Sequence, residues 1–217
     1  RPDVAPNRFV GPLLAVLLAL APSLCAGQSF EKLLWAASKG DIQAVGTFLD
    51  KGLDPNTADS DGNTLLMLAA RYGHQDLVTF LIGRKASVTR RSPHGDTALM
   101  AACLKGHLAT AKVLVENGAE IKHEGWTPLL YAAFEGHTDV IKYLIEKGAD
   151  KNGLAPNGYT PLMLAARNGH LEAARELLYE DADMRIKGAN GETALKIAKE
   201  KNLQELVVLL TRAGAVE

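Results

Sequence analysis

The stretch Gly158–His170, which reads GYTPLMLAARNGH, decides how this chain folds, because three further copies of it occur in the same sequence. These copies are GNTLLMLAARYGH at 62–74, GDTALMAACLKGH at 95–107 and GWTPLLYAAFEGH at 125–137. The Gly-His pair that closes each copy recurs at intervals of 33, 30 and 33 residues. A period of this size indicates a stack of similar units, each of which buries its apolar face against its neighbours.

Each unit is predicted to contain two short helices. In one unit the apolar residues within 65–70 form a short stripe, and Leu77, Val78, Leu81 and Ile82 return at helical spacing. Each first helix is preceded by a threonine whose hydroxyl suits an N-cap. These threonines are Thr64, Thr97, Thr127, Thr160 and Thr193. Two of them are followed by a proline, which is tolerated in the first helical turn.

Small residues and glycines set the spacing of the units. The pairs Ala69-Ala70, Ala101-Ala102, Ala132-Ala133 and Ala165-Ala166 are expected to let helices of successive units approach closely. The glycine after each first helix permits the left-handed turn that ends it. Polar stretches such as residues 57–62 and 155–158 predict projecting turns, which we call fingers. Each unit therefore consists of a finger, a helix, a turn and a second helix.

The blocks resemble ankyrin repeats, whose Thr-Pro-Leu-His, Ala-Ala, Gly-His and Gly-Ala-Asp signatures they match at most positions. Weaker copies flank the four, so that the resemblance covers about residues 29–217. It implies an all-α fold, an ankyrin-repeat solenoid of about six helix-turn-helix repeats joined by β-hairpin-like turns. The repeats are expected near 29–58, 59–91, 92–121, 122–154, 155–187 and 188–217, in a domain of residues 28–217.

Residues 1–27 differ in composition from the rest of the chain. Arg8 precedes an uncharged run over residues 9–21 that is rich in Leu and Ala, and small residues follow up to Gly27. This pattern is typical of a secretory signal peptide cleaved after Ala26 or Gly27, and it is too short for a comfortable membrane span. A frayed apolar leader and an uncleaved anchor are the alternatives. We therefore expect a periplasmic or secreted protein, similar to the exported bacterial ankyrin-repeat proteins.

The charge balance disfavours two classes of partner. The net charge is −1 for the whole chain, and residues 28–217 carry 22 basic against 24 acidic side chains. This balance gives no broad electrostatic grip on nucleic acid. For the same reason we expect no membrane binding once the signal peptide is removed.

Histidines, methionines and cysteines are the candidate ligands for a metal or haem. His74, His107, His137 and His170 occur once per unit, so they cannot converge on one ion; in ankyrin repeats this histidine is structural. The usual histidine of the Thr-Pro-Leu-His signature is replaced by Met67, Met100, Leu130, Met163 and Lys196. Three methionines at regular spacing favour core filling over soft-metal chemistry. Cys103, at the position of Ala70, is expected to be a buried packing residue.

The sequence contains no catalytic motif. No His-Glu-x-x-His, paired-cysteine, Gly-x-Ser-x-Gly, Walker A or dinucleotide glycine motif occurs, and the carboxylates are spread along helices and turns. His94 and His123 lie in fingers, where we expect them to be solvated. We therefore predict a protein that is not an enzyme and holds no cofactor or metal.

Positions that vary between the aligned units are the candidates for partner binding. In a repeat stack the fingers and the first helices form one continuous concave surface, which carries the function. Aromatic and arginine side chains dominate binding hot spots. The candidate residues are Arg71, Tyr72, Arg90, Arg91, His94, Lys105, Trp126, Phe134, Glu135, Tyr159 and Arg167. The alternative for the aromatic residues is packing against neighbouring turns.

The interval of 30 residues marks one shortened finger. Three residues are missing around 119–124, where the other units have a longer hairpin. We expect this notch to expose Trp126 at the centre of the groove and to make it the main anchor for a partner.

The predicted function is binding of a protein partner, by a chain that is expected to be monomeric. Two alternatives remain: an exported protein that binds a ligand, metal or haem through His94, His123 or the methionines, and a secreted effector that acts inside another cell.

Overall fold

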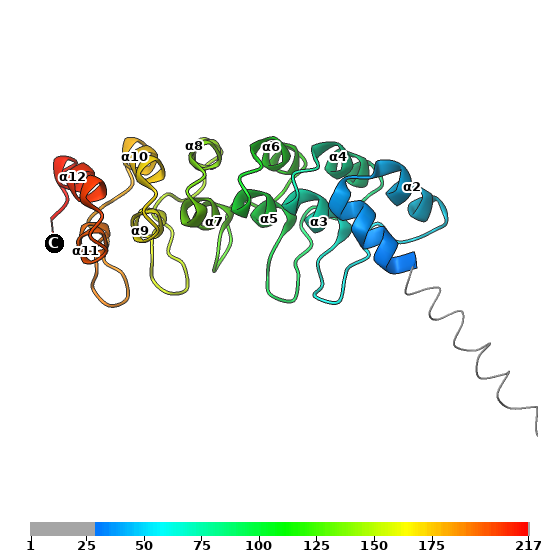
Figure 1. The fold of residues 1–217 in the computed structure, drawn as a ribbon, viewed down its shortest axis with the longest axis horizontal. Coiled ribbons are helices and arrows are strands. Elements are labelled where there is room, and N and C mark those ends of the chain that lie inside the picture. Colours follow the sequence, from blue (N-terminus) through cyan, green and yellow to red (C-terminus); the bar gives the residue numbers. More distant parts are fainter. Residues whose placement is uncertain (1–28, 217) are drawn as a thin grey trace, which may run out of the picture.

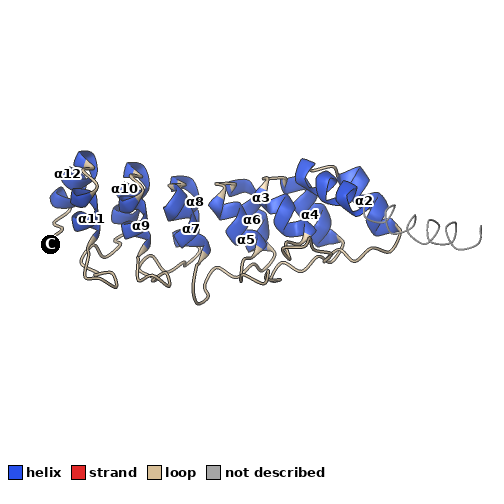
Figure 2. Cartoon of the chain, turned by 60° about the horizontal axis from the view of Figure 1, so that its bottom comes forward, coloured by secondary structure: helices blue, strands red, loops and turns tan. Residues whose placement is uncertain are grey.

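The helices of the chain lie in two parallel rows. The computed structural model describes residues 29–216, and these form helix pairs stacked along one axis (Figure 1). Each pair contributes one helix to an inner row, next to the fingers, and one to an outer row. No strand occurs among these residues, and one isolated bridge joins Ala58 and Thr64 in a finger (Figure 2). The all-α solenoid predicted from the repeats is confirmed.

Neighbouring helices of the same row pack against each other, and so do the two helices of each pair. The inner row consists of helical residues 29–39, α3 (Leu65–Arg71), α5 (Ala98–Leu104), α7 (Pro128–Glu135), α9 (Pro161–Arg167) and α11 (Ala194–Glu200). The outer row consists of α2 (Ile42–Asp50), α4 (Gln75–Gly83), α6 (Leu108–Glu116), α8 (Thr138–Glu146), α10 (Leu171–Tyr179) and α12 (Gln204–Arg212).

The inner helices begin where the threonines predict. In α3, α5, α7, α9 and α11 the N-cap threonine hydroxyl accepts a hydrogen bond from the backbone N–H three residues later, at 3.2 or 3.3 Å. Met67 and Met100 complete this arrangement in α3 and α5, because each sulfur accepts a bond from the backbone N–H of its N-cap threonine. Both methionines are buried, as core filling requires.

The Gly-His pairs lock successive repeats together. The Nε2 atoms of His74, His107, His137 and His170 lie 2.8, 3.1, 3.1 and 2.9 Å from the carbonyl oxygens of Ser38, Arg71, Leu104 and Phe134. Each of these carbonyls belongs to the end of the preceding inner helix. Because a carbonyl only accepts, Nε2 must carry the hydrogen. The structural role implied by the resemblance is therefore confirmed.

The glycine of each pair makes room for the histidine of the next repeat. A Cβ atom on Gly106 would lie 2.5 Å from Nδ1 of His137, and one on Gly73 would lie 2.6 Å from Nδ1 of His107. Both glycines also have positive φ angles, of 73° and 74°. The pair recurs because the histidine of each repeat packs against the glycine of the preceding repeat, and its own glycine receives the histidine of the next.

One small pair is assigned incorrectly by the sequence. Ala102 and Cys103 are both fully buried, whereas Ala101 is only partly buried and faces the inner surface. The close-packed pair is thus Ala102-Cys103, one residue later than expected, because a cysteine replaces the second alanine. Burial raises the pKa of the Cys103 thiol far above its usual value, so this side chain is an inert packing residue.

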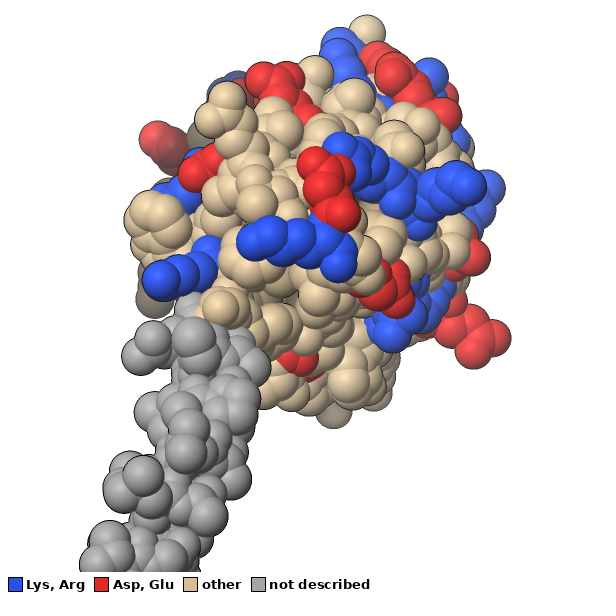
Figure 3. Space-filling model, turned by 90° about the vertical axis from the view of Figure 1, so that its right-hand side faces the viewer, with Lys and Arg blue, Asp and Glu red and all other residues tan. Residues whose placement is uncertain are grey.

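The two ends of the stack carry polar side chains. Figure 3 looks onto the N-terminal end and shows charged groups of both signs with uncharged residues between them. At the other end Lys196, Lys199, Glu200 and Lys201 are all exposed, as expected for a cap. Leu203 takes the place of the histidine in this last repeat.

The predicted signal peptide, residues 1–27, lies outside the described residues. None of the helices within 29–216 has the length and apolar character needed to cross a membrane.

Candidate functional site

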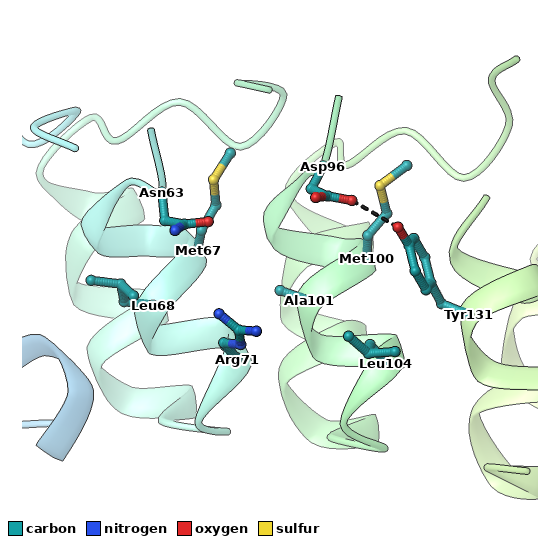
Figure 4. A pocket seen from close by; sticks show the side chains of 9 residues that line it. All are labelled: Asn63, Met67, Leu68, Arg71, Asp96, Met100, Ala101, Leu104 and Tyr131. Atoms are coloured by element: carbon teal, nitrogen blue, oxygen red, sulfur yellow. Dashed lines mark hydrogen bonds between the residues drawn. The ribbon is translucent and has the colours of Figure 1, made fainter. Parts of the chain in front are cut away.

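A hollow opens on the inner face between α3 and α5. Its cavity volume is about 100 Å³, and Tyr131 of α7 closes one side (Figure 4). The lining residues are Asn63, Met67, Leu68, Arg71, Asp96, Met100, Ala101, Leu104 and Tyr131. The floor is therefore apolar, and polar groups from the fingers and helix ends stand around it. A concave surface of this kind suits recognition of a side chain.

Polar contacts hold the wall of this hollow in place. The Tyr131 hydroxyl donates to the Asp96 carboxylate over 2.9 Å and so links α7 to the finger before α5. Burial, together with the bond to Asp96, raises the pKa of Tyr131 to about 12. The amide nitrogen of Asn63 donates to the Asp59 carboxylate at 3.0 Å. The geometry of both rim residues is thus fixed by neighbouring groups.

Three aromatic rings lie together beside the hollow. Trp126 and Tyr131 stack with centroids 5.1 Å apart and planes inclined by 30°, and Phe134 meets Trp126 edge-on at 6.1 Å. The tryptophan also packs against Leu130, Ala155 and Leu164. Trp126 is consequently half-buried, so the expectation that the notch exposes it is not met. These neighbours cover part of its ring.

The shortened finger itself is present. Figure 1 shows that the loop between α6 and α7 projects less far than the loops on either side. Its residue Glu120 pairs with Arg91 of the preceding finger over 2.6 Å. His123 is half-buried, not solvated as expected, and its Nδ1 lies 2.7 Å from the carbonyl oxygen of Glu124.

Most of the predicted partner-binding residues are exposed. Tyr72 and Phe134 expose 52% and 38% of their surface on the inner face. The remaining exposed candidates are Arg71, Arg90, Arg91, His94, Lys105, Glu135 and Arg167. Arg91 is engaged by Glu120, which leaves Arg90 as the open charge of that finger tip.

Tyr159 is half-buried and packs against Leu130, Ala155 and Leu164, the same residues that Trp126 contacts. The pKa of Tyr159 is raised above its usual value, mainly by a hydrogen bond to the Glu192 carboxylate and to a smaller extent by burial. The Arg167 guanidinium lies over the tyrosine ring, 5.4 Å from its centroid. These three residues join the last two repeats, which are not in contact with the hollow between α3 and α5.

The sequence did not single out the helix position that places Leu68, Ala101 and Tyr131 around the hollow. This position holds Trp35, Leu68, Ala101, Tyr131, Leu164 and Ile197 in successive repeats. Trp35 exposes 62% of its surface. When the repeats are aligned, the side chain at this position ranges in size from alanine to tryptophan, which marks it as variable. This variation was hidden because Ala101 was assigned to the close-packed pair.

Within residues 29–216 no group of three or more His, Cys, Asp or Glu side chains is arranged to hold a metal ion. The four histidines of the Gly-His pairs are each bonded to a backbone carbonyl. The groups that remain on the inner face are contact groups for a partner.

The comparisons identify the repeat. A model of the family described as "Ankyrin repeats (3 copies)" matches residues 33–124, 82–155, 120–188 and 152–216. The chain belongs to the ankyrin-repeat family. Ankyrin repeats are typically non-enzymatic scaffolds for protein–protein interaction, which agrees with an inner face that offers contact groups.

Similar proteins share the repeat region. The crystal structure of the human ASB11 ankyrin repeat domain has a TM-score of 0.80 and 28% identity, covering 85% of this chain and 84% of that one. Serine/threonine-protein kinase 12 of Arabidopsis thaliana is 34% identical over 89 residues, which is 41% of this chain but 19% of the kinase. The ankyrin repeat protein YahD of Escherichia coli K12 is 30% identical over 132 residues, covering 44% of this chain and 66% of YahD.

The matched region covers about a fifth of the length of this kinase and also of the E3 ubiquitin-protein ligase XBAT33 of Arabidopsis thaliana. The similarity to these plant proteins concerns their ankyrin repeats. The activities in their names come from other domains.

Proposed function

We propose that this chain is an exported ankyrin-repeat protein that binds a protein partner through its inner face. The observation that carries the proposal is the set of exposed aromatic and cationic side chains at the ends of the inner helices. Tyr72 and Phe134 are solvent-exposed there, with Arg71 and Lys105 between them along the stack. Aromatic and arginine anchors of this kind supply most of the affinity of protein interfaces.

Phe134→Arg tests the inner face at a position where arginine occurs in two other repeats, at residues 71 and 167, although it also removes the edge contact with Trp126. The matched control is Tyr179→Arg, since Tyr179 is 78% exposed at the end of α10 in the outer row. We expect Phe134→Arg to weaken partner binding by about 30-fold, as for a hot spot of about 2 kcal/mol.

The measurement is affinity capture from native extract with the tagged chain, followed by calorimetric titration of the captured partner. Full binding by Phe134→Arg, together with loss in Tyr179→Arg, would place the interface on the outer row and contradict the proposal.

Export is supported by the sequence of residues 1–27. A charge in the apolar run, Leu17→Arg, is expected to retain a C-terminally tagged chain inside the cell, because the run no longer suits the secretory pathway. Cell fractionation and N-terminal sequencing of the exported form provide the measurement. Equal export of the Leu17→Arg chain would count against a signal peptide.

A further inference from the structure

The hollow between α3 and α5 exists because residue 101 is alanine. At the equivalent position the other repeats carry Trp35, Leu68, Tyr131, Leu164 and Ile197. The alanine side chain leaves open the space that a larger residue of α5 would fill. The resulting cavity of about 100 Å³ lies within the row of inner helices and opens to the inner face (Figure 4).

The lining of this hollow suits an aliphatic side chain. Its floor is formed by Met67, Met100 and Ala101, with Leu68 and Leu104 beside them. An apolar protein cavity of roughly 150 Å³ takes up a molecule as large as benzene. The branched side chain of leucine or isoleucine has four carbon atoms, fewer than benzene, so one such group fits this smaller space.

The polar groups around the hollow differ in whether they already have a hydrogen-bond or ion-pair partner within the chain. Asp96 already accepts the Tyr131 hydroxyl at 2.9 Å, and the Asn63 amide is bonded to Asp59. Arg71 is exposed, and Figure 4 shows its guanidinium reaching from α3 toward the gap before α5. Among residues 29–216 no carboxylate forms a salt bridge with Arg71. Its charge is therefore open to a partner.

Exposed cations lie along one edge of this part of the groove. Lys39, Arg71 and Lys105 lie at or directly after the ends of the first three inner helices, and all three side chains are exposed. Asp96 is the carboxylate that lines the hollow, and Tyr131 engages it. A segment that lies across α3 and α5 therefore meets an apolar centre with cations along the edge formed by the helix ends, and an acidic residue beside Arg71 complements that edge.

We propose that the hollow receives one aliphatic side chain from an extended segment of the protein partner, and that an adjacent aspartate or glutamate of that segment pairs with Arg71. This inference rests on the proposed function and names the kind of sequence that the inner face selects. Arg71 would contribute to selectivity because a bidentate pair with a carboxylate fixes orientation as well as charge.

A display library of random seven-residue peptides, selected on the full chain, tests the proposal. We expect enrichment of peptides in which Leu, Ile, Val or Met stands within two positions of Asp or Glu. Ala101→Leu should fold, because leucine occupies the same position in two other repeats, and it should weaken the enriched peptides at least tenfold by filling the hollow.

Charge reversal gives the second readout. Selection on Arg71→Glu should enrich Lys or Arg in place of the acidic residue, while Lys142→Glu, on the outer helix α8, should leave the original pattern unchanged. Absence of the aliphatic-acidic pattern, or equal binding by Ala101→Leu, would overturn this inference. The broader function would still stand if Phe134→Arg abolished binding of the native partner, so the two failures can be told apart.

Discussion

At the scale of single residues, the Gly-His pair acts across a repeat boundary and not within its own repeat. His137 donates to the carbonyl of Leu104 at the end of the preceding inner helix, and its ring lies against Gly106. The glycine contributes twice, because it adopts a φ of 73° and leaves space for the ring. The contact joins two residues about one repeat apart, which explains why the pair recurs with the period of the stack.

Gly106→Ala and Gly118→Ala separate the two contributions of such a glycine. Both positions have positive φ, but a Cβ on Gly118 meets open space, whereas one on Gly106 meets the His137 ring. Backbone strain costs about 1–2 kcal/mol in each variant, and forced repacking adds about 1–3 kcal/mol in Gly106→Ala alone. Urea denaturation followed by circular dichroism measures the difference. Equal destabilisation of the two variants would show that the ring contact contributes nothing.

The Tyr131–Asp96 bond predicts a dependence of stability on alkaline pH. The pKa of Tyr131 is raised from 10.0 to about 12 in the folded chain, so between these values the folded state keeps a proton that the unfolded state loses. The associated stability is complete below pH 10 and disappears as the pH rises through 12. Tyr131→Phe removes this term, so the stability difference between wild type and variant should shrink over that window. Urea midpoints at several pH values provide the test, and a constant difference would contradict it.

The residue-scale chemistry of the scaffold could be predicted from the sequence, because each scaffold residue repeats in register. The N-cap threonines and the structural histidines are examples. The contacts of Trp126 could not be predicted in the same way. Its burial depends on Tyr131 and Phe134, which occur at their positions only in this repeat, and a single occurrence leaves no periodic signal.

At the scale of helices and turns, the outer helices end in a left-handed residue that is usually glycine. Gly52, Gly118, Gly148 and Gly214 have φ angles between 88° and 93°, whereas Lys85 and Asp181 occupy the same position with φ of 69° and 58°. Left-handed backbone is unfavourable for residues with a Cβ atom. The turns after α4 and α10 are therefore strained in comparison with the other four.

Lys85→Gly should relieve this strain and stabilise the chain by about 0.5–1 kcal/mol. The gain is smaller than the full strain because glycine also increases the entropy of the unfolded chain. Lys85→Ala is the control, since it removes the same side chain but keeps the Cβ atom. Thermal unfolding measures the effect, and a glycine variant no more stable than the alanine variant would refute this explanation.

The groove was harder to predict than the helices that form it. The helical spacing of apolar residues predicts each inner helix, but the shape of the surface around the hollow depends on a single side chain in each repeat. Reading Ala101-Ala102 as the close-packed pair placed Ala101 in the core, whereas the structure places it at the hollow. A cysteine in place of one alanine was sufficient to shift the register, because alanine occurs at both neighbouring positions.

At the scale of the whole molecule, each repeat is stabilised by the repeats on either side. Interior helices such as α5 contact two neighbours of their own row, while α11 and α12 have one each. The repeats behave as a chain of nearest-neighbour interactions, in which an end unit is held by one interface. The two ends differ, however, because His74 bonds to Ser38 at the first interface and Leu203 replaces the histidine at the last.

We therefore expect the C-terminal repeat to open before the N-terminal one. Amide hydrogen exchange should be fastest in α12, slower in α2 and slowest in α5 and α7, since local opening follows the number and quality of the interfaces.

Leu203→His supplies the missing hydrogen-bond donor to the backbone carbonyl of Arg167. One added hydrogen bond of about 1 kcal/mol should slow exchange in α11 and α12 several-fold. His170→Leu should have the opposite effect one interface earlier, by removing one of the two side-chain hydrogen bonds that the Phe134 carbonyl accepts. Uniform exchange along the stack, or no response to both substitutions, would mean that the histidine bonds do not set the order in which repeats open.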